Sequence, residues 1–449
     1  MLPTAGLRID QAPPLHLPFR FFGTAPLFAM LTGGVLLLKG QELLLTPLQP
    51  ITVATLHLTL LGWLFMVICG AMIQMIPVLA GIPVPWPSLV PWVHGLLTAG
   101  VGLFFLGLTP DPPLPWALHL ASLSLAMAVG GFLVPIAVAL VKAPARHPTV
   151  NGMRLAMLAM TGTLLLGLFF LAEHADRFVA LDRRILVGIH LLWGLVGTMG
   201  VLILGVSFQV LPMFYMTPAF PDGSARRILS GLALTLVLVP VALLGAGVDH
   251  PWLPWAAALP GSAALILYAV ATRRMLRQKK RQRVDATLTL WLFGFACAAV
   301  ALLLLALWPV TGDERLRFLV GILYVFGWVV PVITGMLHKI VPFLVWFHRF
   351  STLAGLVEIP MMDDLSPVRA VRLQVWLIVG SVGAMILAIL TGWDPLLRLA
   401  GLGLIGIGAI SLYALWFALR IKPPEVEKMP DFASFFKDFV PPSAPGSPP

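Results

Sequence analysis

Long apolar segments are the feature of this sequence that most constrains its fold. Twelve windows of roughly 20 predominantly apolar residues succeed one another along the chain, and each is long enough to cross a bilayer as a helix. Only 11% of the 449 residues are charged and 59% are hydrophobic. The sequence therefore predicts an all-α polytopic membrane protein that contacts the lipid bilayer. The predicted spans are 21–38, 52–80, 90–109, 115–141, 150–172, 185–213, 228–247, 251–272, 286–309, 316–347, 371–392 and 396–419.

The placement of lysine and arginine predicts the orientation of these spans. An even number of spans puts both chain ends on one side of the membrane. The segments on that side hold most of the 29 Lys and Arg, including the run RRMLRQKKRQR at 273–283. By the positive-inside rule this side is the cytoplasm, so we expect a bacterial inner-membrane protein with cytoplasmic N- and C-termini. The net charge of +10 then reflects topology and contact with anionic lipid, and it calls for no nucleic-acid partner.

The spans divide the chain into three predicted regions. A cytoplasmic segment at 1–20, without the apolar core of a cleavable signal peptide, precedes a transmembrane domain at 21–420. Residues 421–449 end in FVPPSAPGSPP, and this composition is typical of a mostly disordered cytoplasmic tail. Cys69 and Cys297 lie in different spans and form no CxxC pair, so neither a disulfide framework nor a thiolate metal site is expected.

One pattern recurs in three spans. The segments are GWLFMVICGAMIQMIP (62–77), GTMGVLILGVSFQVLP (197–212) and GWVVPVITGMLHKIVP (327–342). Each holds two glycines eight residues apart, then a polar residue and a proline. The spacing predicts three four-helix repeats at about 21–141, 150–272 and 286–419, although glycine and proline are common enough in membrane helices for chance to be the alternative. The glycines would let helices pack closely at the centre of the bundle.

The twelve spans, the cytoplasmic termini and the three groups of four helices resemble subunit I of the haem-copper oxidase and nitric-oxide reductase superfamily. GMLHKIVPF (335–343) and GVSFQVLPMF (205–214) resemble the ends of helices ten and six in its C-type oxidases. HLTLLGW (57–63) is similar to the His-then-Gly-Trp spacing of that superfamily and of NnrS-type membrane proteins. The resemblance covers residues 20–420 and implies a twelve-helix fold.

The metal ligands of that superfamily are missing at the matching positions. Its helix ten carries His-x-His, which ligates two haems, whereas the matching residues here are Val320 and Ile322. Its helix seven supplies histidines to the copper centre, and the span 228–247 contains none. The resemblance therefore implies a protein that is degenerate in its ligands and is not a terminal oxidase.

Four of the ten histidines are predicted near the outer ends of their spans, where they are candidates for metal ligands. His57 lies five residues before Gly62, and His190 lies seven before Gly197. Their depths differ by about 3 Å, and two residues turn a side chain by about 200° around a helix. The two imidazoles therefore occupy opposite flanks of equivalent helices and can face each other across a shared pore. His119 and His174 are the reserve candidates.

Neutral imidazole ligates both haem iron and copper. We therefore expect His57 and His190 to bind one b-type haem axially, or else a copper ion. The alternative is that each histidine only hydrogen-bonds a carbonyl or hydroxyl, with Thr55, Thr59 and Thr198 as nearby candidates.

Polar residues near the inner ends of the repeat spans form a second candidate site, an inner polar ring of Gln74, Gln209, Lys339 and His338. In one interpretation the amides bond carbonyls freed by the prolines and Lys339 reaches the interface. In the other, the four residues line a vestibule for a proton, an ion or a small solute. No membrane-embedded Asp or Glu is expected to pair with Lys339.

The function indicated by the sequence is haem binding, or copper binding, in electron transfer or in a nitric-oxide- or copper-related stress or assembly role. The biological setting comes from the resemblance alone. The chain has no CxxCH motif, so an electron donor would be another protein or a quinol. The alternative is a cofactor-free permease or assembly factor on the same scaffold. A third hypothesis, a small-gas reductase, needs a further ligand, and His119 is the candidate.

Overall fold

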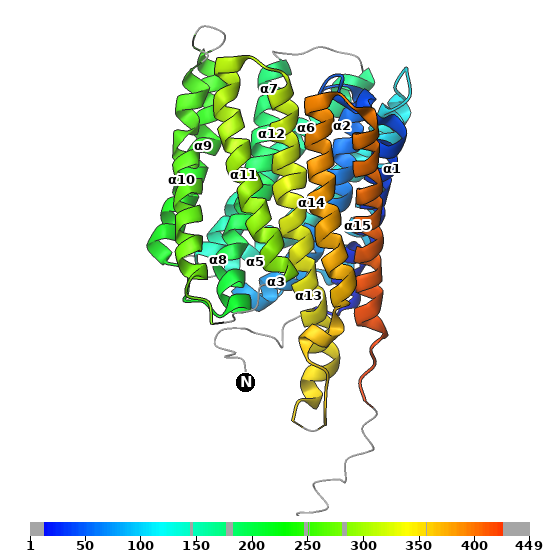
Figure 1. Ribbon diagram of the computed structural model, residues 1–449, viewed down its shortest axis with the longest axis vertical. Coiled ribbons are helices and arrows are strands. Elements are labelled where there is room, and N and C mark those ends of the chain that lie inside the picture. Colours follow the sequence, from blue (N-terminus) through cyan, green and yellow to red (C-terminus); the bar gives the residue numbers. More distant parts are fainter. Residues whose placement is uncertain are drawn as a thin grey trace, which may run out of the picture.

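A computed structural model of the chain describes residues 13–143, 147–176, 183–246, 250, 252–280, 285–355 and 357–424. These residues form a bundle of upright helices (Figure 1), and no β-strand occurs among them. Twelve of the helices are long and apolar enough to cross a membrane, which confirms the number predicted from hydropathy. The expected tail falls largely outside the described residues, as does most of the segment 1–20.

Nine of the spans are single α-helices and three are interrupted by π-helical turns. The single helices are α1 (His16–Lys39), α4 (Val90–Leu108), α5 (Pro115–Lys142), α6 (Pro148–Asp176), α9 (Asp222–Ala246), α10 (Leu253–Leu276), α11 (Ala286–Thr311), α14 (Val368–Thr391) and α15 (Asp394–Arg420). The interrupted spans are α2–η3–α3 (Pro50–His57, Leu58–Phe65, Met66–Ala80), α7–η5–α8 (Arg183–Leu191, Leu192–Gly200, Val201–Tyr215) and α12–η6–α13 (Arg315–Tyr324, Val325–Val329, Val330–Phe350). Short 3-10 turns are η2 (Gly40–Leu44), η4 (Pro87–Leu89), η7 (Ser351–Leu353) and η8 (Met362–Leu365).

The first and last spans lie side by side and antiparallel. Gly33 of α1 abuts Gly401 of α15, and Pro26 abuts Gly408, so the start of α1 lies beside the end of α15. Both ends of the described chain are thus at one end of the bundle, the lower end in Figure 1, which we call the terminal end. The first span starts earlier than predicted, because α1 begins at His16, inside the segment 1–20.

The three π-helical turns coincide with the repeated sequence pattern. Each contains the first glycine of its pattern, namely Gly62 in η3, Gly197 in η5 and Gly327 in η6. A π-turn inserts an extra residue into a helix and commonly marks a functional site. In the first two of these spans the interruption begins just after the candidate histidine, His57 or His190.

The pattern glycines make close contacts, but with a different partner from the one expected. A Cβ on Gly62 would lie 2.5 Å from Phe28 of α1, and one on Gly197 would lie 2.5 Å from Ala159 of α6. A Cβ on Gly327 would lie 2.8 Å from Cys297 of α11. Each glycine thus faces the span that begins its own four-helix group, and the prediction of contacts at the centre is wrong.

The second glycine of the middle pattern gives a packing prediction, because its close neighbour is backbone. A Cβ on Gly205 would lie 2.9 Å from the Cα of Gly152, so backbone meets backbone and no side chain can move aside. We expect Gly205→Leu to lower the free energy of unfolding by about 3 kcal/mol. The matched control is Gly321→Leu in α12, where a Cβ meets nothing within 4 Å. Equal thermal unfolding midpoints for the two purified variants would contradict this packing.

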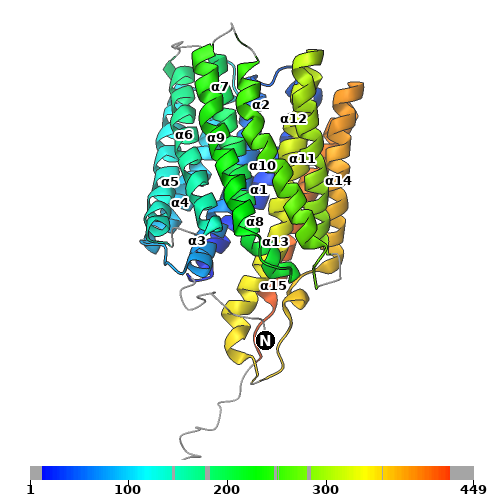
Figure 2. The same cartoon turned by 90° about the vertical axis from the view of Figure 1, so that its left-hand side faces the viewer.

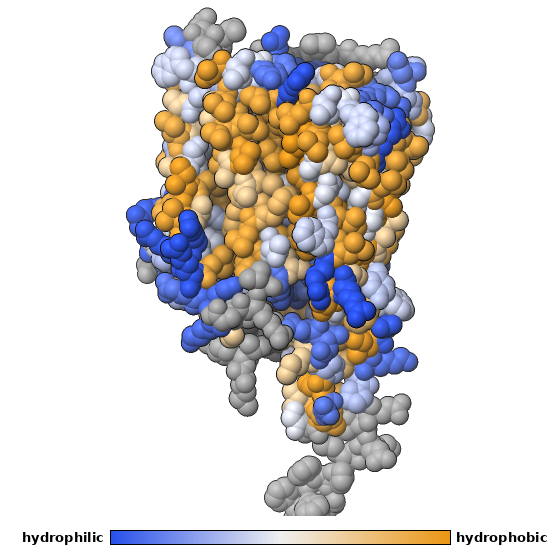
Figure 3. Space-filling view, viewed as in Figure 1, coloured by the Kyte–Doolittle hydropathy of each residue, from blue (hydrophilic) through white to orange (hydrophobic). Residues whose placement is uncertain are grey.

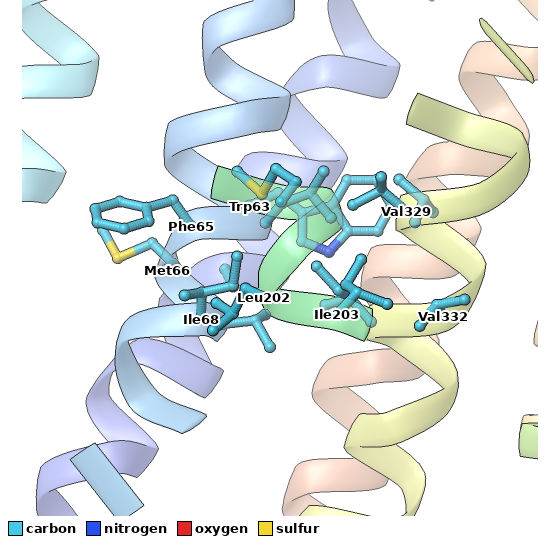
Figure 4. Close-up of a cluster of buried hydrophobic side chains, with 14 of the residues drawn as sticks. Trp63, Phe65, Met66, Ile68, Leu202, Ile203, Val329 and Val332 are labelled. Carbon is cyan, nitrogen blue, oxygen red and sulfur yellow. The ribbon is translucent and has the colours of Figure 1, made fainter. Parts of the chain in front are cut away.

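The centre of the bundle is filled with apolar side chains. Figure 4 shows side chains from the three interrupted spans gathered at mid-height, and they are at most 9% exposed. On the outside, the face shown in Figure 3 is apolar between two polar ends, as a membrane-embedded protein requires. The labelled central residues are Trp63, Phe65, Met66, Ile68, Leu202, Ile203, Val329 and Val332.

Candidate cofactor site at a histidine pair

The structure brings together two histidines that are far apart in the sequence. His57 ends α2 and His190 lies in the last turn of α7. Their imidazole rings are 6.3 Å apart between centroids, with an angle of 23° between the ring planes. Both residues sit just before a π-turn in the half of the bundle away from the terminal end. Among the described residues, the pair thus brings two candidate ligands from separate spans close together.

Hydrogen bonding defines the tautomer of His57. Its Nδ1 lies 2.8 Å from the carbonyl oxygen of Val53, and because a carbonyl only accepts, Nδ1 carries the proton and donates it. The lone pair of the neutral ring is then on Nε2. A ligating histidine in proteins usually has this arrangement, in which a backbone carbonyl fixes the ring and raises the basicity of the other nitrogen.

The second histidine is held in apolar surroundings. His190 packs against the Phe170 ring at 5.6 Å between centroids, while Phe104 lies 4.7 Å from His57. Nδ1 of His190 is buried and has no hydrogen-bond partner within the described part of the chain. An unpartnered buried nitrogen costs roughly 1–3 kcal/mol. Gly167 leaves room for this ring, because a Cβ there would lie only 3.4 Å from Cε1 of His190.

The three candidate threonines do not hydrogen-bond the histidines. Thr55 donates to Ile51 at 2.7 Å and Thr198 donates to Trp193 at 3.0 Å, each to a backbone carbonyl of its own span. Thr59 likewise bonds its own helix. The hydrogen-bonded alternative therefore holds for one nitrogen of His57, which bonds Val53, and His190 has a hydrogen bond to the backbone of Thr163, while its Nδ1 has no partner among the described residues.

The donor set discriminates between the two expected cofactors. Two imidazoles that bind one metal at about 2 Å from opposite sides would place their ring centroids roughly 6 Å apart, and the observed separation of these stacked rings is 6.3 Å. Two neutral imidazoles are also a complete axial set for a haem. By contrast, no cluster of three or more His, Cys, Asp or Glu that could hold a metal occurs among the described residues. The donors present thus fit a haem and do not fit a copper ion with three protein ligands.

The two reserve histidines have partners of their own at the same end of the bundle. His119 Nε2 lies 3.3 Å from Asp176, with both side chains about half exposed. His174 lies 3.2 Å from Arg183, which also lies 3.6 Å from Glu173. Neither histidine joins the pair. The Glu173–Arg183 contact instead links α6 to the start of α7, two helical turns from His190.

Lys339 has an acidic partner, contrary to the sequence-based expectation. Its Nζ lies 2.7 Å from Asp285 Oδ2. Asp285 caps α11 by accepting from the Leu288 amide at 2.9 Å, and it accepts from the Tyr215 hydroxyl at 3.3 Å. Burial would by itself raise the pKa of Asp285, but Lys339 and these two donors hold that pKa below its ordinary value, so the carboxylate is charged at neutral pH.

The four residues of the inner polar ring do not form one site. Lys339 contacts Asp285 at the start of α11, whereas His338 contacts α14, where its Nε2 lies 2.5 Å from Gln374 Oε1. The Gln374 amide donates to the Ile407 carbonyl at 2.7 Å, which fixes its orientation and makes His338 the donor. Both polar atoms of Gln74, and Oε1 of Gln209, are buried without a hydrogen-bond partner among the described residues. The Gln74 amide therefore makes no bond to a proline-freed carbonyl among the described residues.

Comparison with known proteins gives the fold a context. The sequence matches no model of a known protein family and no curated protein. The structure is similar to a chain of a haem-copper terminal oxidase dimer, with a TM-score of 0.58 over 92% of this chain and 86% of that chain. The two sequences are 15% identical, so the similarity concerns the fold. The chain is a multi-pass membrane protein with a haem-copper-oxidase-like fold.

Proposed function

We propose that this chain is a haem-binding integral membrane protein that transfers electrons, with His57 and His190 as the two axial ligands of one b-type haem. The observation that carries the proposal is the pair of imidazoles, 6.3 Å apart between centroids, contributed by two different spans. The oxidase-like fold supports it, since the similar structure is a haem-copper oxidase.

The chain's own residues suit this task. Val53 holds His57 in the tautomer that leaves Nε2 free, and Phe104 and Phe170 surround the pair with apolar rings. A haem held by His57 and His190 would supply one-electron redox chemistry, which suits electron transfer. The donor would be another protein or a quinol.

The other functions have less support. Transport through the centre is disfavoured because Trp63, Leu202 and Val329 fill it with apolar side chains. Oxygen reduction needs the ligands that Val320 and Ile322 replace, and no three-ligand metal cluster occurs among the described residues. The proposed function therefore differs from that of a terminal oxidase, although the fold is oxidase-like. A nitric-oxide- or copper-related stress or assembly role remains the setting implied by the resemblance.

We also propose that the fold is a three-fold repeat with the terminal end in the cytoplasm. The support for the repeat is the equivalent placing of η3, η5 and η6 at the three pattern glycines. The support for the orientation is the basic segment that follows α10 at the terminal end. The histidine pair would then lie in the periplasmic half of the membrane.

Carbon monoxide tests the proposed electron-transfer role directly. A ferrous haem with both axial positions filled has no site for this ligand, so we expect the spectrum of the dithionite-reduced protein to stay unchanged under carbon monoxide. A shifted Soret band would show an open position and would favour the small-gas reductase over the electron carrier.

The space beside His190 gives a further prediction. Since a Cβ on Gly167 would lie 3.4 Å from His190 Cε1, we expect Gly167→Leu to displace the ring and to lower haem content several-fold. Gly102→Leu in α4 is the control, because nothing lies within 4 Å of a Cβ there. The measurement is haem per protein after purification, and equal contents would contradict the role of Gly167.

A further inference from the structure

The helices α9 and α10 pack against each other at the left edge of the bundle in Figure 1, the side that faces the viewer in Figure 2. Of the twelve spans, α10 is the least covered by protein, with 17% of its most apolar window buried. The side chains that this hairpin exposes are apolar along most of its length, so in a membrane they contact acyl chains. They include Leu234, Val237 and Val241 of α9, and Leu259, Ile266 and Val270 of α10.

The apolar face of α10 runs directly into a basic one. Ile266 and Val270 are 63% and 42% exposed, and Arg273, Arg274 and Arg277 follow them as exposed residues. These positions recur at intervals of three and four, which places them on one side of the helix. One helix face therefore presents aliphatic side chains for about two turns and then guanidinium groups.

At this end of the hairpin the exposed arginines outnumber the exposed acidic residue Asp222 among the described residues. Within the described part of the chain, none of these arginines forms an ion pair, and Asp285 is engaged by Lys339. Arg226 and Arg227 of α9 are exposed at the same end. Figure 3 shows the resulting strongly hydrophilic patch at the lower left, below an apolar surface.

We propose that this face binds an anionic diacyl phospholipid, with its headgroup phosphate on Arg273, Arg274 and Arg277 and its acyl chains along Ile266 and Val270. The guanidinium fork suits the oxygens of a phosphate, and the basic cluster lies where a span ends at the membrane surface. A free phosphate has the same oxygens but no acyl chains, so it would leave the apolar face of α10 without a ligand contact. The proposal is independent of the haem.

The test measures binding of dioleoyl phosphatidylglycerol and dioleoyl phosphatidylcholine to the detergent-purified full chain by native mass spectrometry. We expect phosphatidylglycerol to bind more tightly, and Arg273→Gln/Arg274→Gln to weaken it about 30-fold, since each basic residue near a membrane surface contributes about 1 kcal/mol. The control is Arg369→Gln/Arg372→Gln, two exposed arginines at the start of α14 near Asp363 and Asp364. Matching elution volumes and unfolding midpoints would show that the variants are folded.

Each remaining outcome overturns the proposal. Unchanged binding in Arg273→Gln/Arg274→Gln would place the lipid elsewhere. Equal losses in both double variants would mean a diffuse charge effect without a defined site. Displacement of phosphatidylglycerol by millimolar inorganic phosphate, with no preference for the lipid, would identify a free-anion site. Equal binding of phosphatidylcholine would remove the requirement for negative charge.

Discussion

His57→Ala and His190→Ala are each expected to abolish haem binding. Loss of a residue that only orients a metal ligand lowers affinity by about 10–100-fold, so loss of an axial ligand should exceed that range. Haem per protein in the purified variants should fall close to zero, and the reduced alpha band should disappear. Full haem content in both variants would show that the pair does not bind it.

The controls separate ligation from folding. His119→Ala and His174→Ala remove histidines from the same end of the bundle that have other partners, and we expect both to keep their haem. His190→Met offers a thioether, which also ligates haem iron, so this variant should recover haem with a shifted spectrum. A folded His190→Met protein without haem would count against ligation at this position.

Lys339→Met is expected to lower the free energy of unfolding. It leaves the Asp285 carboxylate without its ammonium partner, 2.7 Å away in the wild type. Removing one partner of a buried ion pair lowers the free energy of unfolding by about 3–5 kcal/mol. Because Lys339 is 14% and Asp285 23% exposed, we expect a loss of about 2–3 kcal/mol. Thermal unfolding of the purified protein in detergent measures it.

A second substitution isolates the charge effect. Asp285→Asn keeps a residue that caps helices well and removes the charge, so Lys339→Met/Asp285→Asn should recover most of the lost stability. Lys39→Met is the matched control: its ion pair with Glu42 is more than 40% exposed on both sides, and such pairs contribute less than about 1 kcal/mol. A double variant no more stable than Lys339→Met would show that the loss comes from packing.

Hydropathy was sufficient to predict the twelve spans, because the membrane imposes the same length and composition on every one. The meeting of His57 and His190 could also be anticipated, since the repeat frame gives the depth and direction of each side chain. The ligand role of the pair stays a prediction. That role depends on whether a metal lies between the two imidazole rings, and the spacing of residues in the sequence carries no information about this.

The remaining features depend on contacts between distant segments. Asp285 lies outside the predicted span and next to a basic run, so the sequence indicated a loop residue there. An Asp directly before an apolar run is nevertheless a helix-capping signal. The glycines indicated close packing, but composition does not say which helix approaches, and each one faces the first span of its own group. The π-turns have no recognised signal in the sequence.

The most direct test of the proposal is the optical spectrum of the detergent-purified wild-type protein, air-oxidised and then reduced with dithionite, with iron and copper measured on the same sample. We expect a Soret band, a sharp alpha band on reduction and about one iron per chain. A protein with neither a Soret band nor bound metal would contradict haem binding, and would leave the histidine pair as a packing contact within an oxidase-like fold.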